Sequence, residues 1–154
     1  MYSTPHPTFG TRSRSQTLFH SETGSSGFSK PRLLIVEDDP ALLRMMEVWL
    51  SRHFDVVTAS NGRQALHETV RSSPDLVIAD IDMPFMDGIE LQQALSADPQ
   101  LRHVPFLFVT GNIIRLGTER RYEPGGIDCI VKPFSLNDLR DRILSKLIRH
   151  AEAA

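Results

Sequence analysis

Five short apolar runs alternate along the chain with longer stretches of helical periodicity, and this pattern leaves few folds open to it. Strands that alternate with helices favour βαβ units and a parallel sheet, and almost continuously apolar runs are typical of strands buried on both faces. The sequence therefore predicts an α/β domain. Its expected strands are Leu33–Val36, Val56–Thr58, Leu76–Ala79, Phe106–Val109 and Ile130–Val131.

Helices are expected between and after these runs, over residues 40–52, 62–72, 87–97, 112–122 and 135–150. In the last one, apolar residues recur at the spacing of a single helix face, and Ser135 with Asp138 is typical of a capping box. Around the fourth, Gly111, Gly117 and Pro124-Gly125-Gly126 crowd a 16-residue stretch, and each interior glycine lowers helix propensity. We therefore expect the fourth helix to be short or mobile.

The amino-terminal 30 residues differ in composition from the rest. Seventeen of these 30 are Ser, Thr, Gly or Pro, so we expect a disordered extension. Residues 31–150 are expected to form one domain, and since only four residues follow it, no output domain is expected.

Charge and composition exclude several classes of function. The 17 basic and 19 acidic residues give a net charge of -2, which argues against direct nucleic-acid binding. Apolar runs such as Phe106–Val109 are far shorter than the roughly 20 residues of a membrane span, so no membrane insertion is expected. The single cysteine, Cys129, cannot form an intramolecular disulfide and fits a reducing, cytoplasmic location.

Polar residues directly follow or end four of the five predicted strands. They are Glu37 and Asp38 after the first, Asp80 after the third, Thr110 after the fourth and Lys132 at the end of the fifth. In a doubly wound sheet, ligands bind beyond the carboxyl ends of the strands, so these side chains should meet there. Several carboxylates in one crevice repel unless a cation offsets their charge, and all-oxygen ligation suits Mg²⁺.

An aspartate beside Mg²⁺ and a lysine has what it needs to attack a phosphorus atom. The carboxylate is the nucleophile, while metal and ammonium neutralise the phosphoryl oxygens. The product would be an aspartyl phosphate. Thr110 could donate a hydrogen bond to that group only in the modified state, which can bias a conformational equilibrium.

Four motifs in this order give the chain a resemblance to a known family. They are Leu-Leu-Ile-Val-Glu-Asp-Asp at 33–39, Asp-Ile-Asp-Met-Pro at 80–84 with Met-Asp-Gly at 86–88, Val-Thr at 109–110, and Lys-Pro-Phe at 132–134. Residues 32–150 thereby resemble the receiver domain of bacterial two-component response regulators, of the chemotaxis-regulator type. The resemblance implies a flavodoxin-like (βα)5 fold with strand order 2-1-3-4-5.

The resemblance also implies roles for individual residues. Asp80 resembles the phosphoacceptor, Thr110 the switch hydroxyl and Lys132 the phosphate-binding lysine, and the Lys132-Pro133 peptide is expected to be cis. Gly111 would allow close approach of backbone to phosphate. The Mg²⁺ ligands would be Asp38, Asp80 and the backbone carbonyl of Asp82, with Glu37 acting through water.

Such a protein accepts its phosphoryl group from a histidine kinase or a histidine phosphotransfer protein, and signals by binding a downstream protein. It is a switch and not an enzyme in the usual sense, since it catalyses only its own phosphorylation and dephosphorylation. This sequence departs from the family at Cys129, where most receivers have Tyr or Phe. The usual coupling of an aromatic rotamer to the threonine cannot operate in that form.

Three other functions could use some of the same residues or the same fold. A haloacid-dehalogenase-like phosphatase would use Asp80 and Asp82, but its acidic pair follows the lysine, whereas Glu37 and Asp38 precede Asp80 here. A flavodoxin-like cofactor binder lacks support because carboxylates after the first strand would repel a flavin phosphate. A receiver-like binding module that is never phosphorylated stays open.

Overall fold

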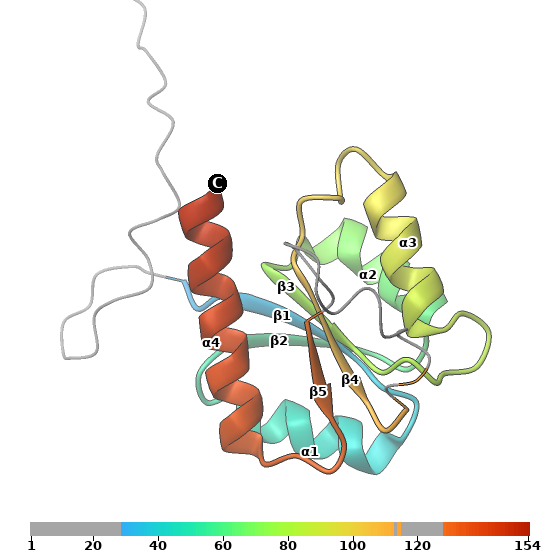
Figure 1. Cartoon of the computed structure of the whole chain (residues 1–154), viewed down its shortest axis with the longest axis vertical. Helices are drawn as coiled ribbons and strands as arrows, with labels where there is room; N and C mark the ends of the chain where they lie inside the picture. Colours follow the sequence, from blue (N-terminus) through green and yellow to red (C-terminus); the bar gives the residue numbers. More distant parts are fainter. Residues whose placement is uncertain (1–28, 113, 115–127) are drawn as a thin grey trace, which may run out of the picture.

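The computed structural model describes residues 29–112, 114 and 128–154, and its strands form one five-stranded parallel sheet. The order is β2-β1-β3-β4-β5, with every neighbouring pair parallel. The predicted sheet with strand order 2-1-3-4-5 is confirmed (Figure 1). The strands are β1 (Arg32–Val36), β2 (Asp55–Ala59), β3 (Leu76–Ala79), β4 (Phe106–Thr110) and β5 (Cys129–Val131).

Helices cover both faces of this sheet, with α1 and α4 on one side and α2 and α3 on the other (Figure 1). The predicted helix over 112–122, apart from residues 112 and 114, and the predicted extension up to residue 28 lie outside the described residues. Within the described part of the chain, no helix combines the length and apolar character needed to cross a membrane. The helices are α1 (Pro40–Leu50), α2 (Gly62–Ser72), α3 (Gly88–Ala97) and α4 (Leu136–Ala153).

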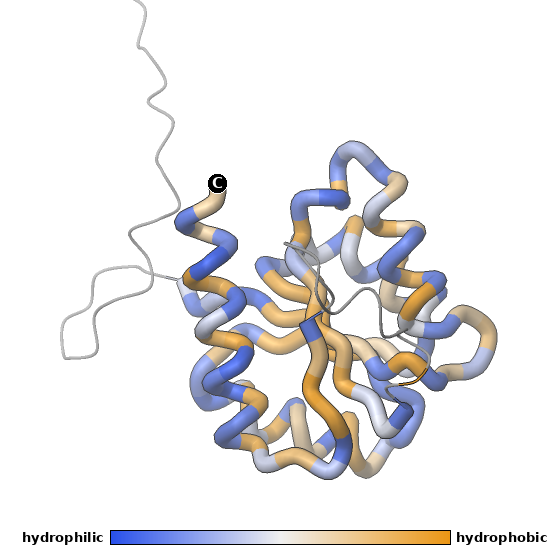
Figure 2. The backbone as a smooth tube through the Cα atoms, viewed as in Figure 1, coloured by the Kyte–Doolittle hydropathy of each residue, from blue (hydrophilic) through white to orange (hydrophobic). Residues whose placement is uncertain are grey.

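The alternation of side chains along β1 explains why the sheet needs helices on both faces. Leu33 and Ile35 pack with α1 and α4, whereas Leu34 and Val36 pack with α2 and α3, and all four are at most 1% exposed. Successive residues of a strand point to opposite faces, so an apolar strand contributes to two cores. The strands form the apolar centre in Figure 2.

Helix caps fix the points at which the chain leaves the sheet. Asp39 caps α1 by accepting hydrogen bonds from two backbone N–H groups, and Asp87 forms a capping box with Glu90 at α3. Ser135 caps α4 through the N–H of Asp138, as its sequence predicts. Helix α4 runs to Ala153, three residues beyond its predicted end, because Ala151, Glu152 and Ala153 do not interrupt it.

Candidate functional site

The polar residues that follow β1 and β3 lie together at the carboxyl edge of the sheet. The strands are paired so that Val36 lies beside Ala79, and the next residues along each strand are Glu37 and Asp80. Glu37, Asp38 and Asp80 each offer a carboxylate oxygen within 4.8 Å of the others. Glu37 is 3% exposed and Asp80 7%, while Asp38 is exposed. The cluster is therefore buried at Glu37 and Asp80 and open to solvent at Asp38.

Lys132, at the end of β5, neutralises part of this cluster. Its Nζ donates to Glu37 Oε2 and to Asp80 Oδ2, with both distances 2.8 Å. The backbone N–H of Lys132 donates to the carbonyl of Thr110 at 2.9 Å, which holds the lysine beside the end of β4. The peptide between Lys132 and Pro133 is cis, as the resemblance implies.

Burial and pairing act in opposite directions on the charged groups of the site. Burial raises the pKa of Glu37, and the hydrogen bonds from Lys132 and the backbone of Asp39 only partly offset that effect. Burial alone would lower the pKa of Lys132, but its hydrogen bonds to Asp80 and Glu37 outweigh burial and raise the pKa. The lysine is therefore a fixed positive charge at neutral pH.

Thr110 and Gly111 form the part of the site contributed by β4. The Thr110 side chain is fully buried, and its Oγ1 accepts a hydrogen bond from the N–H of Asn112 at 2.9 Å. A hydroxyl oxygen can accept and donate at once, so its proton stays available for another acceptor. A Cβ at Gly111 would meet no atom of the described residues within 4 Å.

Asp39 and Asp82, the remaining acidic residues of these loops, hold the site residues through their backbones. The N–H of Asp39 donates to Glu37 Oε1 at 3.1 Å, and the N–H of Asp82 donates to Asp80 Oδ1 at 3.2 Å. The side chain of Asp39 caps α1, and Asp82 is exposed. Use of the Asp82 carbonyl as a metal ligand stays a prediction.

Gly88 shapes the loop behind Asp80, a role that the sequence pattern does not indicate. A Cβ on Gly88 would lie 2.1 Å from the carbonyl oxygen of Asp80, a separation that no side chain can adopt. The Gly88 N–H also donates to the carbonyl of Ile81 at 3.0 Å. The Asp-Gly pair predicts a turn and a helix start, but the contact with Asp80, eight residues back along the chain, is visible only in the folded molecule.

We expect Gly88→Ala to lower the free energy of unfolding by about 1–3 kcal/mol, because the added methyl group must push the Asp80 backbone aside. Gly111→Ala is the matched control, and its effect should stay within about 0.5 kcal/mol since its Cβ enters open space. Denaturant unfolding of both variants measures the difference. Equal losses in the two would show that the Gly88 contact does not support the loop.

The donor set fits a hard divalent cation. Three carboxylates and one lysine ammonium leave two negative charges in excess, and carboxylates offer only oxygen as a ligand atom. Mg²⁺ is typically bound by one or two carboxylates and several waters, which suits a site that is open at Asp38. The residues present are therefore compatible with the predicted cofactor.

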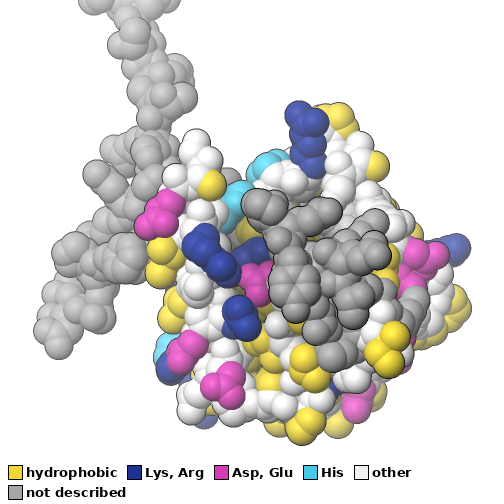
Figure 3. Space-filling view, in the orientation of Figure 1, with side chains coloured by type: hydrophobic (Ala, Val, Ile, Leu, Met, Phe, Trp, Pro, Cys, Tyr) yellow, Lys and Arg dark blue, Asp and Glu magenta, His cyan; other side chains and the backbone are white. Residues whose placement is uncertain are grey.

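Away from this edge, α4 carries a second charged cluster and borders a shallow pocket. Asp128 pairs with three cations of α4, at 3.4 Å for Arg142, 3.5 Å for Lys146 and 2.9 Å for Arg149. Basic side chains gather over α4 in Figure 3.

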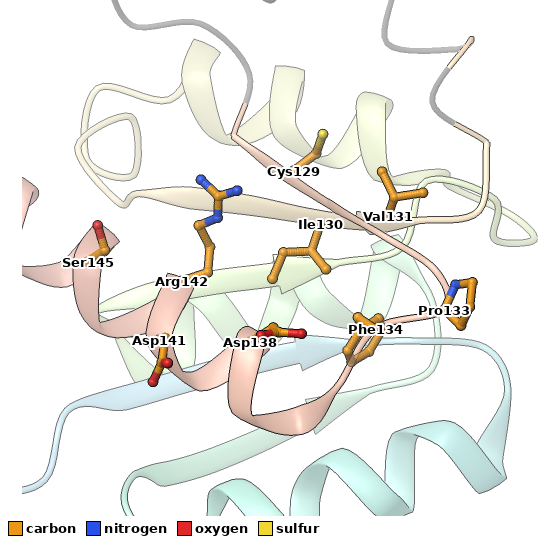
Figure 4. A pocket seen from close by; sticks show the side chains of 9 residues that line it. All are labelled: Cys129, Ile130, Val131, Pro133, Phe134, Asp138, Asp141, Arg142 and Ser145. Carbon is orange, nitrogen blue, oxygen red and sulfur yellow. The ribbon is translucent and has the colours of Figure 1, made fainter.

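The pocket lies between β5 and α4 and contains none of the acidic cluster (Figure 4). Cys129 is half-buried and packs against Phe108 and Ile81 as a small apolar residue.

Comparisons with known proteins agree with this fold. Residues 33–144 match the model of the response regulator receiver domain. Hybrid signal transduction histidine kinase D of Dictyostelium discoideum is 33% identical over 76% of this chain and 8% of its own length. The DNA-binding response regulator MtrA of Mycolicibacterium smegmatis is 32% identical over 80% of this chain and 53% of its own.

A solved structure shows the same architecture. The chemotaxis protein CheY4 of Vibrio cholerae is 25% identical and matches with a TM-score of 0.68, over 77% of this chain and 99% of that one. The chain spans only 8% to 53% of the first three curated relatives, so their other activities are not transferred to it. The family match covers more than half of the chain, and the protein therefore belongs to the response regulator receiver domain family.

Proposed function

We propose that this protein accepts a phosphoryl group on Asp80 from a phosphohistidine of a histidine kinase or histidine phosphotransfer protein. The observation that carries the proposal is the pairing of Asp80 Oδ2 with Lys132 Nζ at 2.8 Å inside a cluster of three carboxylates. Family membership adds the reaction class, since receiver domains are signalling switches. Residues 31–150 would form the whole receiver unit.

The proposed step is an in-line displacement at phosphorus. A carboxylate oxygen of Asp80 forms the new O–P bond while the N–P bond of the phosphohistidine breaks, and the imidazole leaves as a neutral ring after taking up a proton. Lys132 is placed to stabilise charge on the phosphoryl oxygens. Asp82 and Asp39 hold the two buried carboxylates through their backbone N–H groups, so the nucleophile is oriented before the donor arrives.

Asp38, Asp80 and the carbonyl of Asp82 would hold Mg²⁺, and Glu37 would act through water. The ion, when bound, neutralises negative charge on the transferred group and the cluster. Glu37 is engaged by Lys132 and by the Asp39 N–H, whereas Asp38 is exposed and has no hydrogen bond or ion pair within the described part of the chain. This difference favours Asp38 as the direct ligand.

The response to phosphorylation would begin at Thr110. Its oxygen already accepts from Asn112, so a hydrogen bond donated to a phosphoryl oxygen adds a contact that exists only in the modified protein. Cys129 supplies no ring that could turn with the threonine. We therefore expect the loop after β4, which begins at Gly111, to carry the change to a downstream protein in the cytoplasm.

Loss of the Asp38 carboxylate should weaken Mg²⁺ binding by about tenfold or more, and loss of the Glu37 carboxylate should weaken it less. We expect this order because Glu37 is already engaged by Lys132 and the Asp39 N–H, whereas Asp38 is exposed. Calorimetric titration of Asp38→Asn and Glu37→Gln with Mg²⁺ measures both. Asp141→Asn, which removes one exposed carboxylate from α4, is the control for net charge. Unchanged affinity in both cluster variants would exclude the acidic cluster as the metal site.

A further inference from the structure

Phe85, in the loop between β3 and α3, has a backbone conformation that a phenylalanine rarely adopts. Its φ is 69°, in the left-handed region that favours glycine. The N–H of Met86 donates to the carbonyl of Pro84 at 2.9 Å, so Phe85 is the central residue of a three-residue γ-turn with positive φ. Turns of this hand are rare and strained.

The loop on both sides of Phe85 is held in place by its neighbours. The N–H of Gly62, at the start of α2, donates to the carbonyl of Met86 at 3.2 Å. The backbone of Gly88 lies so close to the carbonyl of Asp80 that no Cβ would fit between them. A Cβ on Gly62 would lie 2.6 Å from that same Met86 oxygen. The surroundings therefore impose the turn, and the strain at Phe85 is not released by a small shift of the loop.

The ring of Phe85 gains nothing from burial within the chain. The residue is 81% exposed, and Ile114 in the loop after β4 is 87% exposed. These two are the most exposed large apolar residues in the described part of the chain, and Phe85 lies in the loop that follows Asp80 of the acidic cluster. Strain that persists without a stabilising contact points to a functional constraint.

We propose that Phe85 is a specificity-determining residue that contacts the protein delivering the phosphoryl group. The inference rests on the proposed phosphorylation of Asp80. Asp80 is 7% exposed, so a phosphohistidine reaches it only if the donor's surface covers the loops around the cluster. The strained turn then holds an aromatic ring on that rim, where it enters an apolar contact on the donor. Buried aromatic residues commonly contribute most to such interfaces.

Two substitutions separate the ring from the strain. Phe85→Ala removes the ring but keeps a Cβ in the left-handed conformation, whereas Phe85→Gly removes both. Val70→Ala, on the exposed face of α2, is the control for loss of an exposed apolar side chain. All three are to be compared with wild type in labelling by acetyl phosphate with Mg²⁺, and in transfer from the phosphorylated histidine kinase or phosphotransfer protein of the same organism that labels wild type fastest.

Both Phe85 variants should lose about five- to tenfold in the rate of transfer from the protein donor and keep the wild-type rate with acetyl phosphate. Phe85→Gly should also melt about 2–4 °C above Phe85→Ala, since only glycine relieves the strained φ. Val70→Ala should match wild type in both reactions.

The outcomes distinguish this inference from the function on which it rests. If acetyl phosphate does not label wild type, the proposed phosphorylation fails. If wild type is labelled but both Phe85 variants take the phosphoryl group from the protein donor at the wild-type rate, the donor contact is wrong. If transfer is unchanged but the variants lose the phosphoryl group faster than wild type, the donor contact is also wrong, and the ring instead protects the aspartyl phosphate from water. A wild type that acetyl phosphate labels and no protein donor labels would also overturn the contact.

Discussion

Asp80→Asn should abolish phosphorylation by a small phosphodonor, where wild type gains one phosphoryl group per chain. An amide nitrogen or oxygen cannot replace the carboxylate nucleophile, and Asp80 is a buried carboxylate in direct contact with Lys132 that follows β3, where the resemblance to receiver domains implies the phosphoacceptor. Incubation with acetyl phosphate and Mg²⁺, followed by intact-protein mass spectrometry, measures the incorporation. The group on wild type should be stable in acid and removed by hydroxylamine, as an acyl phosphate is.

Asp82→Asn is the control for Asp80→Asn, because it changes an acidic residue of the same loop without removing the proposed nucleophile. It should retain labelling at one group per chain. Equal labelling of Asp80→Asn and wild type would overturn the assignment. Absence of labelling in wild type as well would instead leave the chain as a receiver-like binding module that is never phosphorylated.

Much of the architecture could be predicted from the sequence because the apolar pattern determines it. The run Leu33–Val36 is buried on both faces, as continuous apolarity indicates, and β1 is accordingly central in the sheet. The predicted strand ends lie within one residue of the observed ones, since each strand is a compact apolar run in the sequence. Because the carboxyl ends of parallel strands meet at one edge of the sheet, Glu37, Asp80 and Lys132 are expected to lie together, and in the structure they are in contact.

The contacts that shape the site could not be predicted in the same way. A sequence pattern shows that Asp-Gly makes a turn, but not that Gly88 must lie against the Asp80 carbonyl. Nor does it show that one lysine hydrogen-bonds two carboxylates, from residues 95 and 52 positions away in the chain. The left-handed Phe85 contradicts local preference, so no propensity argument predicts it. Sites where local rules fail are the ones where function is to be sought.

Lys132→Met should lower the free energy of unfolding by about 2–4 kcal/mol at neutral pH in the absence of metal. The substitution leaves Glu37 and Asp80, at 3% and 7% exposed, as buried carboxylates without their cation. Lys146→Met is the matched control: the two lysine side chains are 25% and 23% exposed, but Asp128 keeps Arg142 and Arg149 when Lys146 is lost. Its cost should be below about 1 kcal/mol.

The stability loss of Lys132→Met should depend on pH, because the pKa values of Glu37 and Lys132 are both raised in the folded protein. Burial raises the pKa of Glu37 above 4.5, so its charge destabilises the fold progressively as pH rises from the unfolded pKa through the folded one. Without Lys132 the opposing hydrogen bond disappears, and the penalty at neutral pH grows. In wild type the pKa of Lys132 is raised above 10.5, so its contribution is fully present at neutral pH and is lost only as pH rises through that higher value. Lys132→Met should therefore differ most from wild type at pH 7–9 and least near pH 5.

Mg²⁺ separates the role of Lys132 as a cation from a role in packing. A divalent ion at Asp38 and Asp80 offsets the charge that Lys132→Met leaves behind, so saturating Mg²⁺ should raise the melting temperature of Lys132→Met more than that of wild type. Thermal unfolding with and without Mg²⁺ measures both. An equal rise in the two proteins, or a loss that does not change between pH 5 and pH 8, would mean that Lys132 supports the site by packing and not by charge.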